Sequence, residues 1–158
     1  RGSWGAGSKE SVNLIYEDSV WAILGSLDGR NAHLVEQVAA RSHITYLETR
    51  ATESTLSQAY VPWFFRCIPN DDQQSISILE HINHNGGGIL AVLYSDNYDT
   101  RMAAESFTRI TTRTGFESPE IFMSDPDKPQ FNQYIQQLRR KKSITSSLQI
   151  IQAPTWRS

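Results

Sequence analysis

The side chains of this sequence that are best suited to chemistry lie in three polar loops, each of which follows a predicted strand. The loops span residues 27–31, 48–52 and 95–99. The three loops occupy topologically equivalent places, because each follows the carboxyl end of a strand. Ligands of open α/β sheets bind beyond these strand ends. Their polar and aromatic contents favour recognition of a small ligand over catalysis.

Several residues of these loops offer groups that bind polar ligands. Arg30 and Arg50 offer bidentate donors for a carboxylate. Asn31 is predicted to begin a helix, whose free N–H groups favour an anion. Thr52 offers a hydroxyl group, and Tyr98 offers an amphipathic aromatic wall. Each side chain alone also fits an ordinary structural role, as a solvated cation, a turn cap or a core residue, so the prediction depends on their shared placement.

The sequence lacks the motifs that identify common α/β enzymes. It contains no G-x-G-x-x-G fingerprint, no P-loop and no G-x-S-x-G nucleophile elbow. His81 and His84 lie three residues apart on a predicted helix, but no third ligand is implied, and an exposed helix surface is the favoured interpretation. Cys67 is the single cysteine, which excludes an internal disulfide, and its apolar neighbours favour packing. The sequence therefore predicts no enzyme, no metal site and no cofactor.

Asp96 supports one alternative interpretation, a receiver-like signalling domain or a small flavodoxin-like enzyme. It follows a predicted strand, as the phosphorylated aspartate of receivers does. A receiver also needs a pair of acidic residues after its first strand, and residues 24–27 supply none. This alternative predicts an acidic pocket that binds magnesium, or a bound flavin, and a complete sheet within these residues.

Composition and charge restrict the broad class of protein. The 158 residues are 39% hydrophobic and 20% charged, which is typical of a globular protein. The net charge of -2 and the pI near 6.1 argue against a nucleic-acid partner. The basic run from Arg139 to Lys142 ends a predicted helix, where cations favour the helix dipole. No run approaches the ~18 apolar residues of a membrane span.

Periodic apolar residues predict alternating strands and helices. Strands are predicted within residues 20–24, 43–47, 60–68, 89–94, 121–123 and 148–151, the first of them buried. Helices are predicted over 5–17, from 31 through 39, from 71 to before 86, from after 99 to before 115, and around 131–138. Such alternation indicates parallel βαβ units, and Pro62 argues against a central strand at 60–68. The predicted fold class is α/β, with parallel sheets that carry helices on both faces.

An ordered series of segments resembles a known family. Residues 20–26, 35–39 and 44–47 resemble parts of the first lobe of type I periplasmic binding proteins. Residues 51–56, with the sequence ATESTL, resemble the family's A-T-x-x-x-L loop. Residues 65–74 resemble its phenylalanine-arginine segment and the helix that enters the second lobe, and residues 90–98 resemble that lobe's first strand and ligand-side loop. The chain is most similar to the branched-chain amino-acid type, the extracellular ligand-binding receptors of ABC transporters.

The resemblance implies a non-catalytic receptor with two Rossmann-like lobes, both incomplete in this chain. Residues 1–68 would belong to the first lobe, 69–71 to a crossover and 72–158 to the second lobe. A small polar solute, an amino acid or a related carboxylate or amide, would be held between the lobes for ABC-type import. By position, the implied ligand contacts are Gly29, Arg30, Asn31, Arg50, Ala51, Thr52 and Tyr98.

The sequence departs from the family at the ligand loops. Residues 29–31, Gly-Arg-Asn, stand where small hydroxyl residues are common. Residues 48–50, Glu-Thr-Arg, replace a serine-rich strand end, and Asp99 replaces a glycine. The additional arginine residues point to a more acidic solute than leucine.

The resemblance also implies a fragment of an exported parent, located in the periplasm or outside the cell, whose partner is an ABC transporter permease. The chain would carry about half of each lobe, and the open edges and apolar faces of a half-sheet favour dimerisation or strand exchange. The same lobes resemble the ligand-sensing parts of transcription regulators and membrane receptors, which is a third interpretation.

Overall fold

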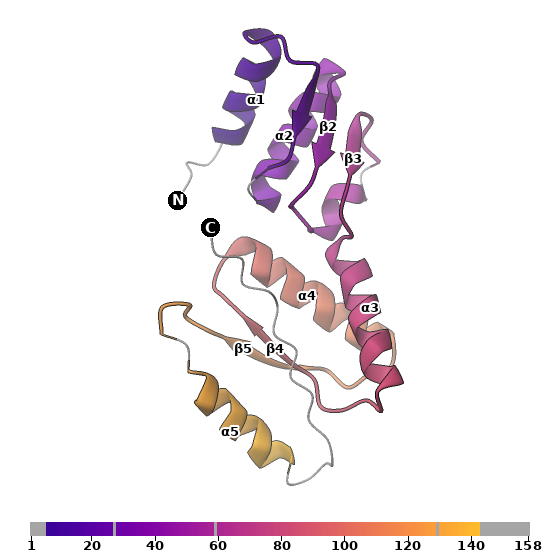
Figure 1. Cartoon of the computed structure of the whole chain (residues 1–158), viewed down its shortest axis with the longest axis vertical. Coiled ribbons are helices and arrows are strands. Elements are labelled where there is room, and N and C mark those ends of the chain that lie inside the picture. The colour runs from indigo at the N-terminus through magenta and orange to yellow at the C-terminus, as the bar shows by residue number, and fades with distance from the viewer. Residues whose placement is uncertain (1–5, 27, 59, 129, 143–158) are drawn as a thin grey trace. The chain divides into compact units, whose positions relative to one another are not determined.

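The computed structural model describes residues 6–26, 28–58, 60–128 and 130–142. The chain forms two compact units, of which the first ends at Asp71 and the second begins at Asp72. Each unit contains its own sheet of parallel strands (Figure 1). The predicted α/β class with parallel sheets is therefore confirmed, while the strand predicted at 148–151 lies outside the described residues.

The first unit has a parallel sheet whose strand order follows the chain. Its elements are α1 (Ala6–Tyr16), β1 (Ala22–Leu24), α2 (Gly29–Ser42), β2 (Thr45–Glu48), η1 (Ser54–Ser57) and β3 (Phe64–Arg66). β2 lies between β1 and β3, and both pairs are parallel. The segment after Pro62 thus forms an outer strand of the described sheet, as the proline predicts.

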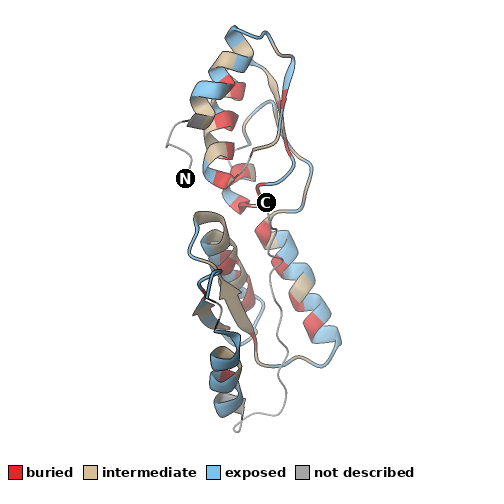
Figure 2. Cartoon of the chain, turned by 60° about the vertical axis from the view of Figure 1, so that its left-hand side comes forward, coloured by how far each residue is buried: buried red, intermediate tan, exposed pale blue. Residues whose placement is uncertain are grey.

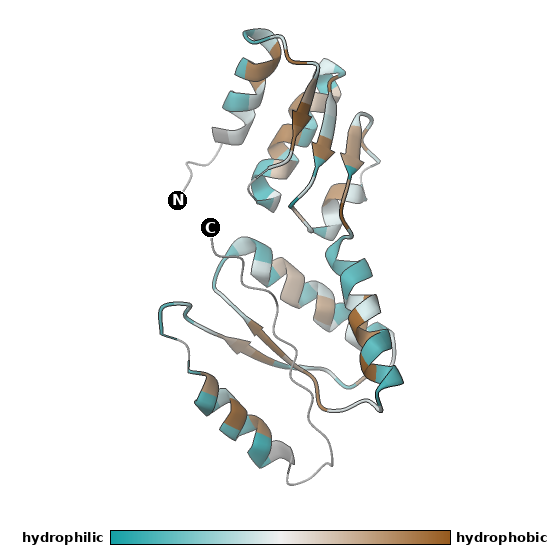
Figure 3. Ribbon diagram, in the orientation of Figure 1, coloured by the Kyte–Doolittle hydropathy of each residue, from teal (hydrophilic) through white to brown (hydrophobic). Residues whose placement is uncertain are grey.

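One face of this sheet forms the core of the first unit. Ile23, Tyr46 and Phe64 are paired in register across the three strands. The first two are buried and pack with Val35 and Ala39 of α2. Ile15 of α1 packs against the same cluster, so both helices cover this face. Figure 2 shows the buried positions of the unit and Figure 3 its apolar strands.

The opposite face of the sheet is largely exposed. Leu24, Leu47 and Phe65 form the next row in register, one residue further along each strand. Leu24 is 72% exposed and Phe65 is 55% exposed. The expectation of a buried first strand is therefore wrong, because only Ile23 of β1 is buried and the two described helices of this unit share the other face.

The second unit is built around two parallel strands. Its elements are α3 (Asp71–His84, which begins at the last residue of the first unit), β4 (Ala91–Tyr94), α4 (Tyr98–Arg113), β5 (Glu120–Met123) and α5 (Phe131–Lys142). Leu79 and Ile82 of α3 pack with Leu90 and with Ile110 of α4. The ring of Phe122 on β5 lies 5.0 Å from that of Tyr134 on α5, between ring centroids. The strand pair is therefore held by the apolar cluster of α3 and α4 beside β4 and by the aromatic contact of α5 with β5.

Helix ends correct two details of the sequence interpretation. Asp28, not Asn31, caps α2: its carboxylate accepts a hydrogen bond from the Asn31 backbone N–H. Asn97 caps α4 in the same way, accepting from the Thr100 N–H, so that Tyr98 opens the helix instead of lying in a loop. Both caps place an Asx side chain before the helix, where it satisfies otherwise unpaired N–H groups. At the end of α3, Gly86 supplies the positive φ of 93° that its turn requires.

Packing in the second unit predicts a position-dependent loss of stability. We expect Leu79→Ala to lower the free energy of unfolding by about 2–5 kcal/mol, because it leaves a cavity at a side chain that is 2% exposed. Ile76→Ala, on the same helix but 41% exposed, is the matched control and should cost about 1 kcal/mol or less. Urea unfolding followed by circular dichroism measures both, and equal losses would contradict this core assignment.

Candidate functional site

The carboxyl edge of the first unit's sheet is organised by one buried carboxylate. Glu48, the last residue of β2, is 0% exposed. Its Oε1 accepts hydrogen bonds from the backbone N–H groups of Arg50 and Ala51, both at 2.7 Å. Its Oε2 accepts from the Ser26 hydroxyl at 2.8 Å and from the Tyr46 hydroxyl. We call these four donors and their shared carboxylate the Glu48 network.

The local sequence explains why these groups meet. Tyr46 and Glu48 are two residues apart on one strand, so both side chains point to the same face. Ser26 follows β1 by two residues, and β1 is paired with β2 so that Leu24 lies opposite Leu47. The parallel register therefore brings Ser26 beside the end of β2. The network joins the loop after β1 to the loop after β2.

The network fixes the charge states of its members. Burial by itself raises the pKa of Glu48, but the hydrogen bonds from Tyr46, from the Ala51 and Arg50 N–H groups and from Ser26 outweigh it and leave the pKa lowered. Burial, and next the bond to Glu48, raise the pKa of Tyr46 strongly. Glu48 is therefore an anion and Tyr46 a neutral donor at physiological pH.

A second carboxylate occupies the start of α2. Asp28 Oδ1 accepts from the Asn31 backbone N–H at 2.8 Å, and Oδ2 accepts from the Asn31 side-chain amide at 2.9 Å. Ser26 Oγ lies 3.0 Å from the Asp28 carbonyl oxygen, which links this cap to the Glu48 network. The sequence interpretation of this helix end as a site for an external anion is therefore wrong for the Asn31 N–H, because Asp28 supplies the anion.

Arg66, the last residue of β3, supports the loop after β2, which we call the second loop. Its guanidinium donates to the Ser57 hydroxyl at 2.8 Å and to the carbonyl oxygens of Ala51 and Glu53 at 2.6 and 2.7 Å. Burial lowers the pKa of Arg66, which the surrounding carboxylates partly offset. The Thr52 carbonyl also accepts from the Asp71 N–H at 2.8 Å. The carbonyl oxygens of Ala51, Thr52 and Glu53 are thus all held by hydrogen bonds.

The predicted ligand residues of the first unit lie along this edge with different exposures. Gly29 and Ala51 are buried, Asn31 and Thr52 are half-buried, and Arg30 and Arg50 are exposed. The Glu48 network brings their two loops together. Glu48 and Arg66 were not among the predicted site residues, although a glutamate two residues after the tyrosine of a predicted strand and an arginine in the phenylalanine-arginine segment were signals in the sequence.

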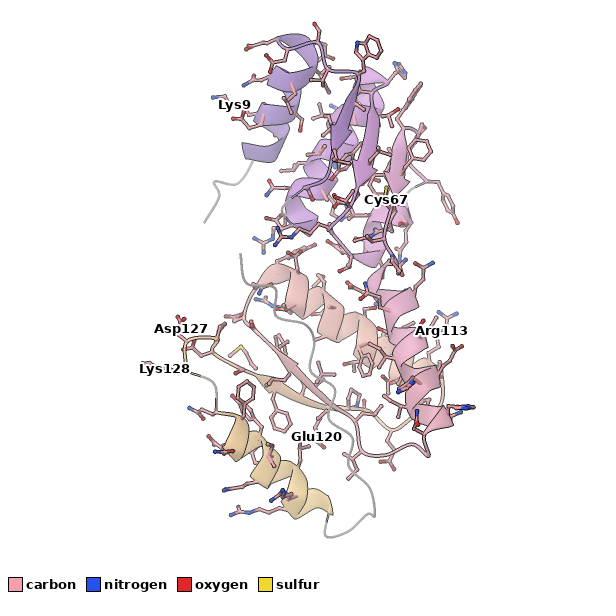
Figure 4. The ribbon with its side chains drawn as sticks, viewed as in Figure 1. Lys9, Cys67, Arg113, Glu120, Asp127 and Lys128 are labelled. Carbon is pink, nitrogen blue, oxygen red and sulfur yellow. The ribbon has the colours of Figure 1, made fainter. Side chains whose placement is uncertain are left out.

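Candidate residues elsewhere have ordinary surroundings. In the second unit, Tyr98 is half-buried at the start of α4. Asp96 is exposed and forms an ion pair with Arg101 at 2.8 Å. His81 and His84 are exposed, as expected. Cys67, labelled in Figure 4, is exposed after β3, so the expectation that it packs is wrong. Among the described residues, no group of three His, Cys, Asp or Glu side chains is arranged to hold a metal ion.

A cavity of about 290 Å³ lies beside β3 and η1, away from the predicted ligand residues. Its lining consists of Leu56, Ser57, Tyr60, Val61, Phe64 and Arg66. None of the seven predicted contacts is among these residues, so the cavity gives no support to the predicted site. None of the described helices is long and apolar enough to cross a membrane.

His33, on α2, lies between the buried carboxylates of Glu36 and Glu53. Its Nδ1 is 3.6 Å from Glu36 Oε2, and its Nε2 is 3.3 Å from Glu53 Oε1 and 3.0 Å from the Thr55 hydroxyl. Glu36 and Glu53 are 4% and 6% exposed, and Glu36 Oε1 has no hydrogen-bond partner among the described residues. The interaction with Glu36, against the opposing effect of burial, and then that with Glu53 raise the pKa of His33 above its ordinary value of 6.5.

Comparison with known proteins gives matches in both sequence and structure. No protein-family model matches the chain. Over 97 residues, 61% of the chain, the sequence is 32% identical to glutamate receptor 3.7 of Arabidopsis thaliana, of which this match covers 10%.

Two solved structures are similar to most of the chain. An ABC transporter substrate-binding protein from Desulfitobacterium hafniense matches 96% of the chain with a TM-score of 0.75 and 14% identity; 44% of that protein is covered. A branched-chain amino-acid transporter substrate-binding protein from Streptococcus pneumoniae, in complex with isoleucine, matches 96% with a TM-score of 0.66 and 14% identity, and 49% of it is covered. The chain therefore has the type I periplasmic-binding-protein fold, as the sequence resemblance predicts, and spans less than half the length of these proteins.

The His33 contacts predict a pH-dependent stability. Because the folded-state pKa of His33 is raised, its contribution is full below 6.5 and is lost as the pH rises through the folded-state value. We expect the wild type to exceed His33→Gln in unfolding free energy by more at pH 5.5 than at pH 8.5, as urea unfolding measures. His84→Gln, which removes an exposed imidazole, is the control. An equal pH trend for the two variants would contradict the His33 assignment.

Proposed function

We propose that this chain, which has the type I periplasmic-binding-protein fold, is the solute-capturing part of a non-catalytic receptor. The proposed solute is small and polar: an amino acid or a related carboxylate or amide. The observation that carries the proposal is the Glu48 network, which joins two ligand loops at the carboxyl edge of one parallel sheet. Binding at that edge is the general rule for open α/β sheets.

The proposed roles follow from where each residue lies. In the proposed site, exposed Arg30 and Arg50 contact the solute from the two loops, and half-buried Thr52 offers its hydroxyl from the second loop. Gly29, Asn31 and Ala51 shape the backbone of these loops, and Tyr98 provides the contact proposed for the second unit. The rigid attachment of the second loop by Arg66 supports binding, since a fixed loop loses less conformational entropy when a solute is captured.

We consider two roles for the full-length protein of which this chain would be a part. The structural matches to ABC transporter substrate-binding proteins, one with isoleucine, support solute delivery to a transporter permease from the periplasm or the cell exterior. The sequence match to a plant glutamate receptor supports the ligand-sensing part of a membrane receptor instead. In both roles the first unit binds solute without bond chemistry. Dimerisation of the chain stays a prediction, motivated by exposed Leu24 and Phe65.

The alternative centred on Asp96 has little support in the structure. A receiver-like site would need an acidic pocket for magnesium, whereas Asp96 is exposed and paired with Arg101. It would also need one complete sheet, whereas the described residues form a three-stranded and a two-stranded sheet. Magnesium with a phosphate mimic nevertheless belongs in the binding experiment, because a response to that pair alone would replace the receptor proposal.

Solute binding can be tested on the purified chain with amino acids, their amides, small carboxylates and magnesium with a phosphate mimic. We expect one solute class to raise the melting temperature, and Arg50→Ala or Thr52→Ala to weaken its affinity by about tenfold or more, as loss of one polar contact does. Titration calorimetry measures the affinity. The matched control is Arg113→Ala, an exposed arginine at the end of α4 (Figure 4). Equal affinities in the Arg50, Thr52 and Arg113 variants would remove the second loop from the site.

A further inference from the structure

The two backbone donors of the second loop already hold an anion. The N–H groups of Arg50 and Ala51 converge on a single oxygen, Glu48 Oε1, each at 2.7 Å. Adjacent N–H groups that converge in this way form an anion-binding site, and a carboxylate is their natural ligand. Here the carboxylate belongs to the chain itself.

The carboxylate of Glu48 has a full set of hydrogen-bond donors. Both of its oxygens accept two hydrogen bonds, with Ser26 and Tyr46 completing the set on Oε2. The side chain is 0% exposed, so water does not compete for these donors. An external carboxylate would have to displace a buried anion that has four donors, and Glu48 would then be left buried without them.

The surrounding charges oppose an external anion as well. Glu36, Glu48, Glu53 and Asp71 all act electrostatically on the half-buried Arg66. All four are less than 9% exposed, so this interior carries more negative than positive charge. Arg30 and Arg50 are exposed, and solvent and salt weaken the attraction of exposed guanidinium groups for an anion. An uncharged amide or hydroxyl group meets no such opposition, and the buried carboxylates attract an ammonium group more strongly than the screened, exposed guanidinium groups repel it.

We propose that Glu48 is a specificity-determining residue, whose carboxylate fills the anion position of the second ligand loop, so that this loop accepts an uncharged or cationic group of the solute and excludes a carboxylate. This inference rests on the proposed function and narrows it. Among the proposed solutes it favours those that present an amide, a hydroxyl or an ammonium group to residues 50–52.

Acetate and acetamide test the inference, because they have similar shapes and differ in charge. Each is titrated into the 158-residue chain while NMR follows the backbone N–H signals of Arg50 and Ala51. In the wild type, acetate should leave both signals unchanged. In Glu48→Ser, which removes the internal carboxylate, acetate should shift both signals saturably, with an affinity at least about tenfold above that of the wild type. Glu48→Gln is the matched control, since its amide oxygen can still accept from both N–H groups.

Several outcomes would overturn the inference. Saturable acetate shifts of the wild-type Arg50 and Ala51 signals would show that a carboxylate enters this loop, and the proposed solute binding would then survive. A folded Glu48→Ser variant that ignores acetate would also overturn it. Conversely, acetate binding to Glu48→Ser with no response of the wild type to any solute would support the role of Glu48 and remove the proposed function.

A wild-type measurement keeps the test valid if Glu48→Ser does not fold. The Arg50 and Ala51 N–H groups donate to a buried carboxylate, so their hydrogen exchange should be slow. The Thr49 N–H, in the same loop but not one of the two backbone donors to the Glu48 carboxylate, is the reference signal. Slow exchange at both donors supports the occupied anion position, and exchange as fast as in an open chain would overturn it.

Discussion

The burial of one carboxylate constrains the whole edge of the first unit. An ionised group without partners is very costly in a protein interior, so Glu48 requires donors from every direction. It obtains them from β2 itself, from the loop after β1 and from two backbone N–H groups. Because one of these donors, Ser26, lies 22 residues before Glu48, the charge of one side chain fixes how two loops lie together.

Arg66 complements this arrangement from the other side of the second loop. Glu48 holds the loop by its N–H groups, and Arg66 holds it by two carbonyl oxygens. The Ala51 peptide units are therefore bound at both the donor and the acceptor end. Because an anion and a cation both bind this loop, few backbone conformations are open to it. The positions of Thr52 and of the exposed Arg50 are therefore well fixed.

Hydrophobic periodicity predicted the order of the helices and strands well, because burial of apolar side chains decides it. The exposure of Leu24 beside buried Ile23 was not predicted, because a continuous apolar run does not show that only one face of the strand is covered. The sequence could not show which carboxylates turn inward. Asp28 was a loop residue beside a better-looking cap at Asn31, and Glu48 seemed an ordinary polar strand end. Their partners come from register and from backbone N–H groups, which leave no pattern in side-chain types.

The same distinction changes what the extra arginine residues mean. In the sequence, Arg30 and Arg50 pointed to a more acidic solute, because the sequence shows the charge of a side chain but not its burial. In the structure those two cations are exposed, whereas the carboxylates of Asp28 and Glu48 already take N–H donors along the edge. A buried charge acts through a lower dielectric than an exposed one and is less screened. For the proposed function, the buried carboxylate of Glu48 therefore weighs more in solute selection than the exposed cations Arg30 and Arg50.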